Sequence, residues 1–357
     1  MTVATPHLPP WASWLPDRVT APVVRWSLRR DRRRAAEAAD PELRGVNARS
    51  PREYSGVAWK AILRRVWLAN GDRNLSLLAA GVAFYAFLSF VPLLAALVLS
   101  YGLIADPGTV ARHMNTIIEL VPADAARLIS EQLVNLTTTA ARQKGFGLAM
   151  ALGVSVFGAT RASRAMITAL NVIYEQHDQR GVIGGMAVSA LLIVGAILTG
   201  IVGIFAASML SWAGRLRASF GDTVVLMVQG MTWVVAGGLC CLAIGAMYRF
   251  APNRESAHWR WLSIGSVAAT VLWLVATLGF GVYAAQFSNY NATYGSLGAV
   301  VVLLMWLFVS AYAILIGGLI NAETERQTAQ DSTTGPARPM GQRGAVVADM
   351  SAAEGDG

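Results

Sequence analysis

Residues Leu297–Ile320 are 24 consecutive residues without a charged side chain. A transmembrane helix needs about 20 apolar residues, so this segment alone predicts a helix that crosses a bilayer. The whole chain agrees, because 55% of its residues are hydrophobic and 14% are charged, against about 25% charged in soluble globular domains. The chain is therefore expected to be a polytopic membrane protein with its core built in lipid.

Five further apolar segments have spanning length, which predicts an all-α membrane protein with six transmembrane helices. The expected spans are Leu75–Ile104, Gly145–Tyr174, Val182–Trp212, Thr223–Phe250, Trp261–Ala285 and Leu297–Ile320. The second span is the weakest in hydropathy because Arg161 and Arg164 interrupt it. A five-span alternative, with this segment at the membrane surface, stays open at this point.

Lysine and arginine are distributed unevenly between the two sides of these spans. The side that holds both termini carries 23 of them, and the other side carries 6. Since basic residues are enriched in cytoplasmic loops, both termini are expected to be cytoplasmic. The first seventy residues lack an apolar segment behind a basic one, so a cleaved signal peptide is not expected.

The six-span membrane domain is expected at residues 74–322, with other segments around it. These are a basic, disordered cytoplasmic segment (1–53), an amphipathic juxtamembrane helix (54–73), an outer loop with short helices (105–144) and a disordered cytoplasmic tail (323–357). The juxtamembrane helix has apolar residues at helical spacing with basic residues between them, which predicts a position in the membrane interface. The apolar residues are Trp59, Ile62, Leu63, Val66 and Trp67.

The second span carries a polar stripe along one helical face. Its members are Arg161, Arg164, Thr168, Asn171 and Glu175. Arg161 lies about 24 Å along the helix from Gly145, where an arginine costs at least a few kcal/mol unless it snorkels, pairs or faces water. Either both arginines snorkel to the cytoplasmic interface, or they line a cytoplasm-facing cavity and bind an anionic head group such as phosphate.

The first span adds polar candidates at helical spacing, namely Tyr85, Ser89 and Pro92. The predicted substrate-binding residues are therefore Arg161, Arg164, Thr168, Asn171, Tyr85 and Ser89. Pro92 removes a backbone donor and predicts a kink. The kink would serve either packing or a substrate pathway.

The last span is bounded by residues expected to shape its two ends. Tyr294-Gly295-Ser296 is predicted to be its entry turn, because glycine permits unusual backbone geometry and serine can cap free amides. At the other end, small residues allow a close helix contact across which Asn321 hydrogen-bonds, or Asn321 is a plain interfacial amide. The predicted structural or gating residues are Pro92, Tyr294, Gly295, Ser296, Gly298, Gly317, Gly318, Asn321 and Glu323.

Catalytic chemistry has little support in the sequence. The four histidines lie in separate segments, and no metal-ligand spacing, P-loop or nucleophile motif is present. Cys240 and Cys241 are adjacent in an apolar span, which supports neither a disulfide framework nor a metal site. The chain is not expected to be an enzyme, or to need a metal or a cofactor. No aromatic residues interleave with the N-terminal arginines, so a nucleic-acid partner is not expected.

Five segments together resemble the YihY/virulence factor BrkB family, bacterial inner-membrane proteins once labelled ribonuclease BN. They are Ala79–Leu94, Arg161–Glu175, Met247–Asn253, Tyr294–Trp306 and Gly317–Glu323, in order and at the family spacing. The resemblance implies six membrane helices with both termini in the cytoplasm, and the ribonuclease label is regarded as a misassignment. In one departure from the family pattern, Leu319 stands where the family often has an intramembrane glutamate.

Residues and resemblance together favour a transporter or flippase-like protein for an anionic amphiphile, such as a lipid or an envelope precursor. The alternative is a membrane scaffold or envelope-assembly factor that transports nothing, and an ion or small-solute transporter ranks third. Ribonuclease activity is disfavoured. Membrane lipids and the amphiphile are the expected partners, and the oligomeric state is open.

Overall fold

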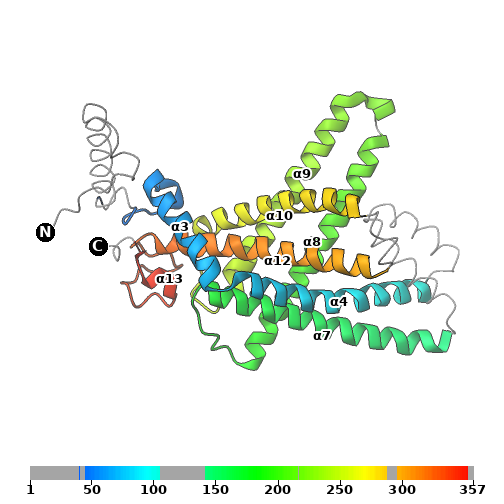
Figure 1. Ribbon diagram of the computed structural model, residues 1–357, viewed down its shortest axis with the longest axis horizontal. Helices are drawn as coiled ribbons and strands as arrows, with labels where there is room; N and C mark the ends of the chain where they lie inside the picture. Colours follow the sequence, from blue (N-terminus) through cyan, green and yellow to red (C-terminus); the bar gives the residue numbers. More distant parts are fainter. Residues whose placement is uncertain (1–39, 41–44, 105–140, 216, 288–295, 353–357) are drawn as a thin grey trace, which may run out of the picture.

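The structure, a computed structural model, describes residues 40, 45–104, 141–215, 217–287 and 296–352 (Figure 1). These residues form a short 3-10 helix, η2 (Pro51–Glu53), and the helices α3 (Gly56–Asp72), α4 (Leu75–Ile104), α7 (Ala141–Ile173), α8 (Val182–Arg215), α9 (Arg217–Phe250), α10 (Trp259–Phe287), α12 (Ser296–Arg326) and α13 (Val346–Asp349). The long helices follow the apolar runs of the sequence.

Six of the described helices are long and apolar enough to cross a membrane, which confirms the predicted fold class. The weakest predicted span, now α7, is one of them: its apolar part covers Phe146–Ile173. The five-span alternative is therefore not supported. The predicted outer loop lies almost entirely outside the described residues, as do Tyr294 and Gly295 of the predicted entry turn, and α12 begins at Ser296.

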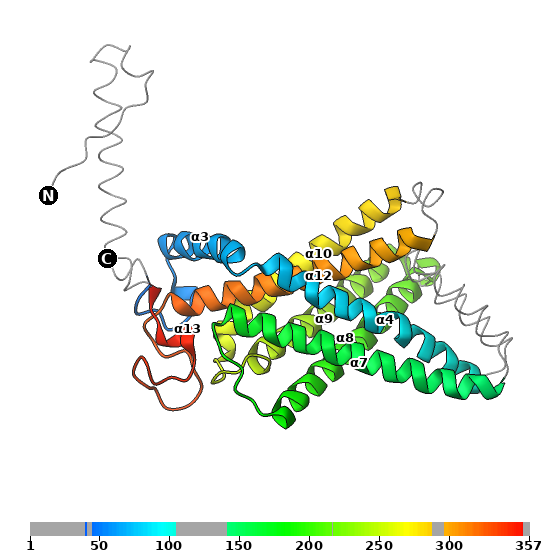
Figure 2. The same cartoon turned by 60° about the horizontal axis from the view of Figure 1, so that its bottom comes forward.

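Helices α4, α7, α10 and α12 run side by side, with α12 in contact with both α4 and α10 (Figures 1 and 2). The hairpin of α8 and α9 crosses this group obliquely (Figure 1). Helix α3, the C-terminal tail and α13 lie together at one end of the bundle, called the α3 end below. The connections from α7 to α8 and from α9 to α10 also lie at that end (Figure 1).

A very close contact joins α10 to the end of α12. A Cβ atom on Gly265 would overlap the carbonyl oxygen of Gly317, and one on Gly317 would lie 2.5 Å from the carbonyl oxygen of Gly265. Asn321 is 1% exposed. Its Oδ1 accepts a hydrogen bond from the Gly265 amide at 2.7 Å, and its Nδ2 donates to the Leu262 carbonyl at 3.1 Å. The structure thus places Asn321 across a helix contact, the first of the two interpretations drawn from the sequence.

Helix α3 is amphipathic, but its apolar residues face two ways. The Ser55 hydroxyl caps its start by accepting a hydrogen bond from the Ala58 amide at 3.2 Å. Ile62 and Val66 are buried in the protein core, whereas Trp67 is 78% exposed. Ile62 and Val66 therefore do not fit the sequence-based interpretation of these residues as the membrane-facing side of the helix, which stays a prediction for the exposed ones.

The C-terminal tail is folded along residues 327–352, whereas the sequence predicted disorder from residue 323 onward. Arg343 is 5% exposed and donates to the carbonyl oxygens of Ala329 at 2.8 Å and Ala348 at 2.6 Å. The Ala329 amide in turn donates to the Val46 carbonyl at 2.8 Å. The tail is ordered by polar bonds to other segments, which its low hydrophobicity does not reveal.

Candidate functional site

Arg161 and Arg164 lie on an exposed face of α7, together with Thr168. Ile167, next to Thr168 in sequence, is 4% exposed, so the two sides of the helix are clearly separated. Arg161 precedes the end of α7 at Ile173 by 12 residues, which is about 18 Å at 1.5 Å per residue. Both arginines are thus set deep in the apolar part of the span.

The guanidinium of Arg161 lies over the ring of Phe157, 5.0 Å from its centroid. Among the described residues, neither Arg161 nor Arg164 has a carboxylate partner within ion-pair distance. By contrast, Arg65, Arg73, Arg254 and Arg326 each contact a glutamate. The two arginines therefore keep their hydrogen-bonding capacity available for an anion.

Tyr85 and Ser89 lie on α4, where it packs against α7. A Cβ atom on Gly158 would come within 2.7 Å of the Ser89 Cβ, so the two helices touch at this level. Because the helices run antiparallel, Tyr85 and Arg161 lie roughly one turn from this contact, both toward the α3 end. Ser89 thus belongs to a tight helix contact, and α4 continues as a helix through Pro92 to Ile104.

The two C-terminal residues of the predicted polar stripe, Asn171 and Glu175, bind other parts of the protein. Asn171 is 5% exposed, and its Oδ1 accepts a hydrogen bond from the Asn253 amide at 2.8 Å. Glu175 pairs with Arg73 and with Arg326, each at 2.6 Å. Asn171 and Glu175 therefore hold the α3 end together, whereas Arg161, Arg164 and Thr168 stay accessible.

Glu323, a predicted gating residue, is the centre of a group of charges at the α3 end. Its side chain is 2% exposed and pairs with Arg65 at 3.0 Å and with Arg73 at 3.3 Å. Arg73 also donates to the Ile173 carbonyl oxygen at 2.5 Å. These bonds join α3, α7 and α12, so they fix the relative positions of three helix ends.

A second, more deeply buried ion pair joins Arg254 to Glu325. The guanidinium makes two bonds to the carboxylate, at 2.8 and 2.5 Å, and the two side chains are 2% and 1% exposed. Burial lowers the pKa of Arg254, but the adjacent Glu325 carboxylate and Tyr174 together raise it, and the net shift is upward. Arg254 also lies 5.0 Å from the centroid of the Tyr174 ring.

Sequence reasoning missed the roles of Arg65, Arg73, Arg254 and Glu325. It took these basic residues as signals of topology, or for Arg65 of an interfacial helix, and placed Glu325 in a disordered tail. The available signal was the presence of opposite charges at the same end of several spans. Charges so close to apolar spans are expected to pair when they become buried.

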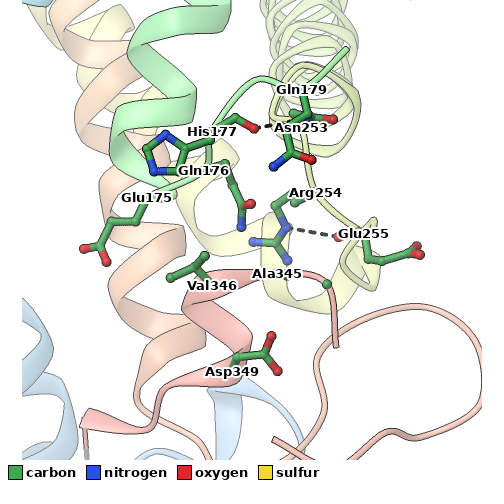
Figure 3. Close-up of a pocket in the computed structure, with 11 residues that line it drawn as sticks. Glu175, Gln176, His177, Gln179, Asn253, Arg254, Glu255, Ala345, Val346 and Asp349 are labelled. Atoms are coloured by element: carbon green, nitrogen blue, oxygen red, sulfur yellow. Dashed lines mark hydrogen bonds between the residues drawn. The ribbon is translucent and has the colours of Figure 1, made fainter. Parts of the chain in front are cut away.

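An open pocket of about 650 Å³ lies at the α3 end, between the segment after α7, the loop before α10 and the tail (Figure 3). Its lining includes the carboxylates of Glu175, Glu255 and Asp349. Arg254 is the only arginine or lysine among the described lining residues, and Glu325 neutralises it. This pocket suits an anion poorly, and Arg161 and Arg164 are not among the residues that line it.

Comparison with known proteins identifies the family of this chain. Residues 66–341, which include every described span, match the virulence factor BrkB family. The chain belongs to the virulence factor BrkB family. No solved structure matches this BrkB family member.

Its relatives are bacterial proteins. The ribonuclease-like protein YfkH of Bacillus subtilis is 27% identical over 266 residues, covering 74% of this chain and 93% of that protein. A UPF0761 membrane protein of Nitrosospira multiformis is 28% identical, covering 70% of this chain and 58% of the relative. For a UPF0761 membrane protein of Rhodospirillum centenum the identity is 28%, and the shares are 78% and 60%. The chain thus spans about three fifths of the two longer relatives.

This BrkB family member buries Leu319 fully, in the core between the spans. The glutamate that the family often has at this place would be a buried carboxyl group here. Glu323, one helical turn further along, forms ion pairs with Arg65 and Arg73. This chain therefore cannot use a mechanism that needs a carboxylate at residue 319.

Proposed function

We propose that this BrkB family member binds the headgroup of an anionic amphiphile, a lipid or an envelope precursor, and moves it across the membrane. The observation that carries the proposal is the pair Arg161 and Arg164, exposed and without a carboxylate partner among the described residues, in an apolar span. Arginine is the side chain best suited to phosphate and carboxylate, because its planar fork can donate two bonds at once.

The membrane supplies the reason for an amphiphilic substrate. An unpaired arginine at this depth is costly, and a phosphate-bearing headgroup that reaches it would offset that cost. The apolar tails of the same molecule could stay in lipid beside the exposed apolar residues of α7, such as Phe157, which is 58% exposed. Thr168, on the same exposed face, supplies a hydroxyl for a further hydrogen bond.

The alternative function, a scaffold or assembly factor that transports nothing, is favoured by the tight helix contacts. Gly158 against Ser89 and Gly265 against Gly317 leave no space for a side chain between the paired helices. A transport path along these pairs would require the helices to separate. The two functions therefore differ in whether lipid movement accompanies lipid binding.

Lipid movement can be measured in proteoliposomes that contain phosphatidylglycerol with a fluorescent headgroup. We expect the full-length protein to increase the rate at which inner-leaflet lipid becomes reducible by external dithionite. A double Arg161→Ala/Arg164→Ala variant should lose most of this rate, since each charged hydrogen bond is worth about 1.5–3 kcal/mol, or roughly tenfold or more. Arg260→Ala removes an exposed arginine at the start of α10 and serves as the matched control.

The same vesicles decide between the two functions. Headgroup binding without an increase in the transfer rate would favour the scaffold. If Arg260→Ala reduces the rate as much as the double variant does, the effect comes from general charge, and the assignment to α7 is refuted.

The proposed location is the bacterial inner membrane with both termini in the cytoplasm, so the α3 end would be cytoplasmic. The excess of basic residues on that side supports this orientation. A reporter active only in the cytoplasm, fused after Gly357, should be active, and a periplasmic reporter at the same position should be silent. The reverse pattern would refute the orientation.

A further inference from the structure

Helix α3 has an exposed face that the protein itself leaves uncovered. Leu63, Trp67 and Leu68 on this face are 55%, 78% and 51% exposed. Lys60 and Arg64 are exposed as well. Residues four apart lie above one another on a helix, so Leu63 and Trp67 form one row and Lys60, Arg64 and Leu68 form the adjacent row. These five residues are called the outer face of α3.

The opposite side of α3 is held firmly by the bundle. Ile62 is fully buried. Arg65 pairs with Glu323 of α12 at 3.0 Å, and the Asn70 side chain accepts a hydrogen bond from the Tyr312 hydroxyl at 2.9 Å. The helix therefore cannot rotate to bury Trp67 without breaking these bonds.

Helix α3 lies next to the start of the first candidate membrane span. α3 ends at Asp72, and the apolar part of α4 begins at Leu75, so the helix adjoins the point where the chain enters the bilayer. Figure 1 shows α3 crossing the end of α12 obliquely rather than continuing along the bundle. Tryptophan is enriched at the interface between membrane and water. Long basic side chains next to a membrane extend toward the lipid headgroups.

We propose that the outer face of α3 is a docking surface for anionic lipid headgroups. Trp67 and Leu63 enter the headgroup region, and Lys60 and Arg64 contact lipid phosphates. Charge complementarity selects this occupant, because the outer face carries two basic residues and no carboxylate. The one acid of α3, Asp72, is the last residue of the helix and continues the row of Lys60 and Arg64 two turns beyond Arg64, so basic residues outnumber it two to one. Basic residues at the surface of an anionic leaflet are attracted to it.

The proposal is independent of transport and can be tested on the full-length protein in nanodiscs. Cys240→Ala and Cys241→Ala remove the native thiols, and Trp67→Cys introduces one site for an environment-sensitive fluorophore. Ala337→Cys, an exposed position in the tail, is the matched aqueous control. Quenching is then measured with lipids spin-labelled near the headgroup and with iodide in the buffer.

We expect the fluorophore at residue 67 to be quenched by the spin-labelled lipid at least twofold more than the one at residue 337, and by iodide at least twofold less. Adding phosphatidylglycerol to phosphatidylcholine discs should strengthen the lipid quenching at residue 67. Lys60→Glu/Arg64→Glu should abolish that increase, and the variant's melting temperature would verify that it is folded.

Two results would overturn the docking itself, and a third would overturn the role of Lys60 and Arg64. Protection from both quenchers would mean that a protein covers the face, and strong iodide quenching would mean that the face lies in water. A phosphatidylglycerol effect that survives the charge reversal would remove Lys60 and Arg64 from the account.

Discussion

Gly265→Ala is expected to destabilise the folded protein more than a single methyl addition at any other glycine that the structure describes. The new Cβ would overlap the Gly317 carbonyl oxygen and the Asn321 side chain, and the backbone of α12 cannot move aside cheaply. Overpacking of this kind costs about 3 kcal/mol or more, roughly 10 °C of melting temperature for a domain of this size. Thermal melts in detergent measure the shift.

Gly279→Ala is the matched control, because it lies on the same helix and a Cβ there meets nothing within 4 Å. It should melt like the natural protein, or slightly higher because alanine favours helix. Equal melting temperatures for Gly265→Ala and Gly279→Ala would show that α10 and α12 do not meet at Gly265.

Two different contacts at the end of α12 allow two substitutions on this helix to be ranked. Gly318→Leu should be more damaging than Asn321→Ala, because a Cβ on Gly318 already lies 3.2 Å from Leu170 and 3.3 Å from Tyr248. Asn321→Ala removes two interhelical hydrogen bonds without adding bulk. If Gly318→Leu melts like the natural protein, this side of α12 faces lipid rather than α7 and α9.

Loss of either partner in the Arg254–Glu325 pair is the second large expected effect. Arg254→Met leaves a buried carboxylate, and Glu325→Gln leaves a buried guanidinium, because both side chains are almost fully covered. Breaking a buried pair from one side costs about 3–5 kcal/mol. Each variant should therefore melt well below the natural protein in detergent.

Two controls separate this pairing from a general effect of charge. The double variant Arg254→Met/Glu325→Gln should cost clearly less than the sum of the single changes, because no buried charge remains unpaired. Arg338→Met breaks only the exposed contact to Glu255 at 3.9 Å and should cost less than about 1 kcal/mol. Additive single effects would contradict the pairing.

The spans could be predicted from the sequence because hydrophobic length is a local property. The third span was predicted to start at Val182, where α8 begins, and the fourth was predicted to end at Phe250, where α9 ends. The last span was predicted to end at Ile320, whereas α12 continues to Arg326. Its charged last turn remains helical because Glu323 and Glu325 pair with residues far away in sequence.

For the candidate site too, relations within one helix could be predicted from the sequence, whereas contacts between distant segments could not. Spacing along one helix was enough to place Arg161, Arg164 and Thr168 on one face, because that relation lies within α7. It could not show that Asn171 binds Asn253, which is 82 residues further along the chain. Nor could it show that Ile62 faces the protein while Trp67 does not, because both fit the same apolar stripe.

The most direct test of the account asks whether the arginine face of α7 reaches water and an anion. Single cysteines are introduced by Arg161→Cys, Arg164→Cys, Thr168→Cys and Ile167→Cys in a chain with Cys240→Ala and Cys241→Ala. A membrane-impermeant thiol reagent is then added from the proposed cytoplasmic side. We expect labelling at residues 161, 164 and 168, slower labelling when short-chain phosphatidylglycerol is added, and protection at residue 167. Equal protection at all four positions would contradict it, because the arginines would then face only lipid.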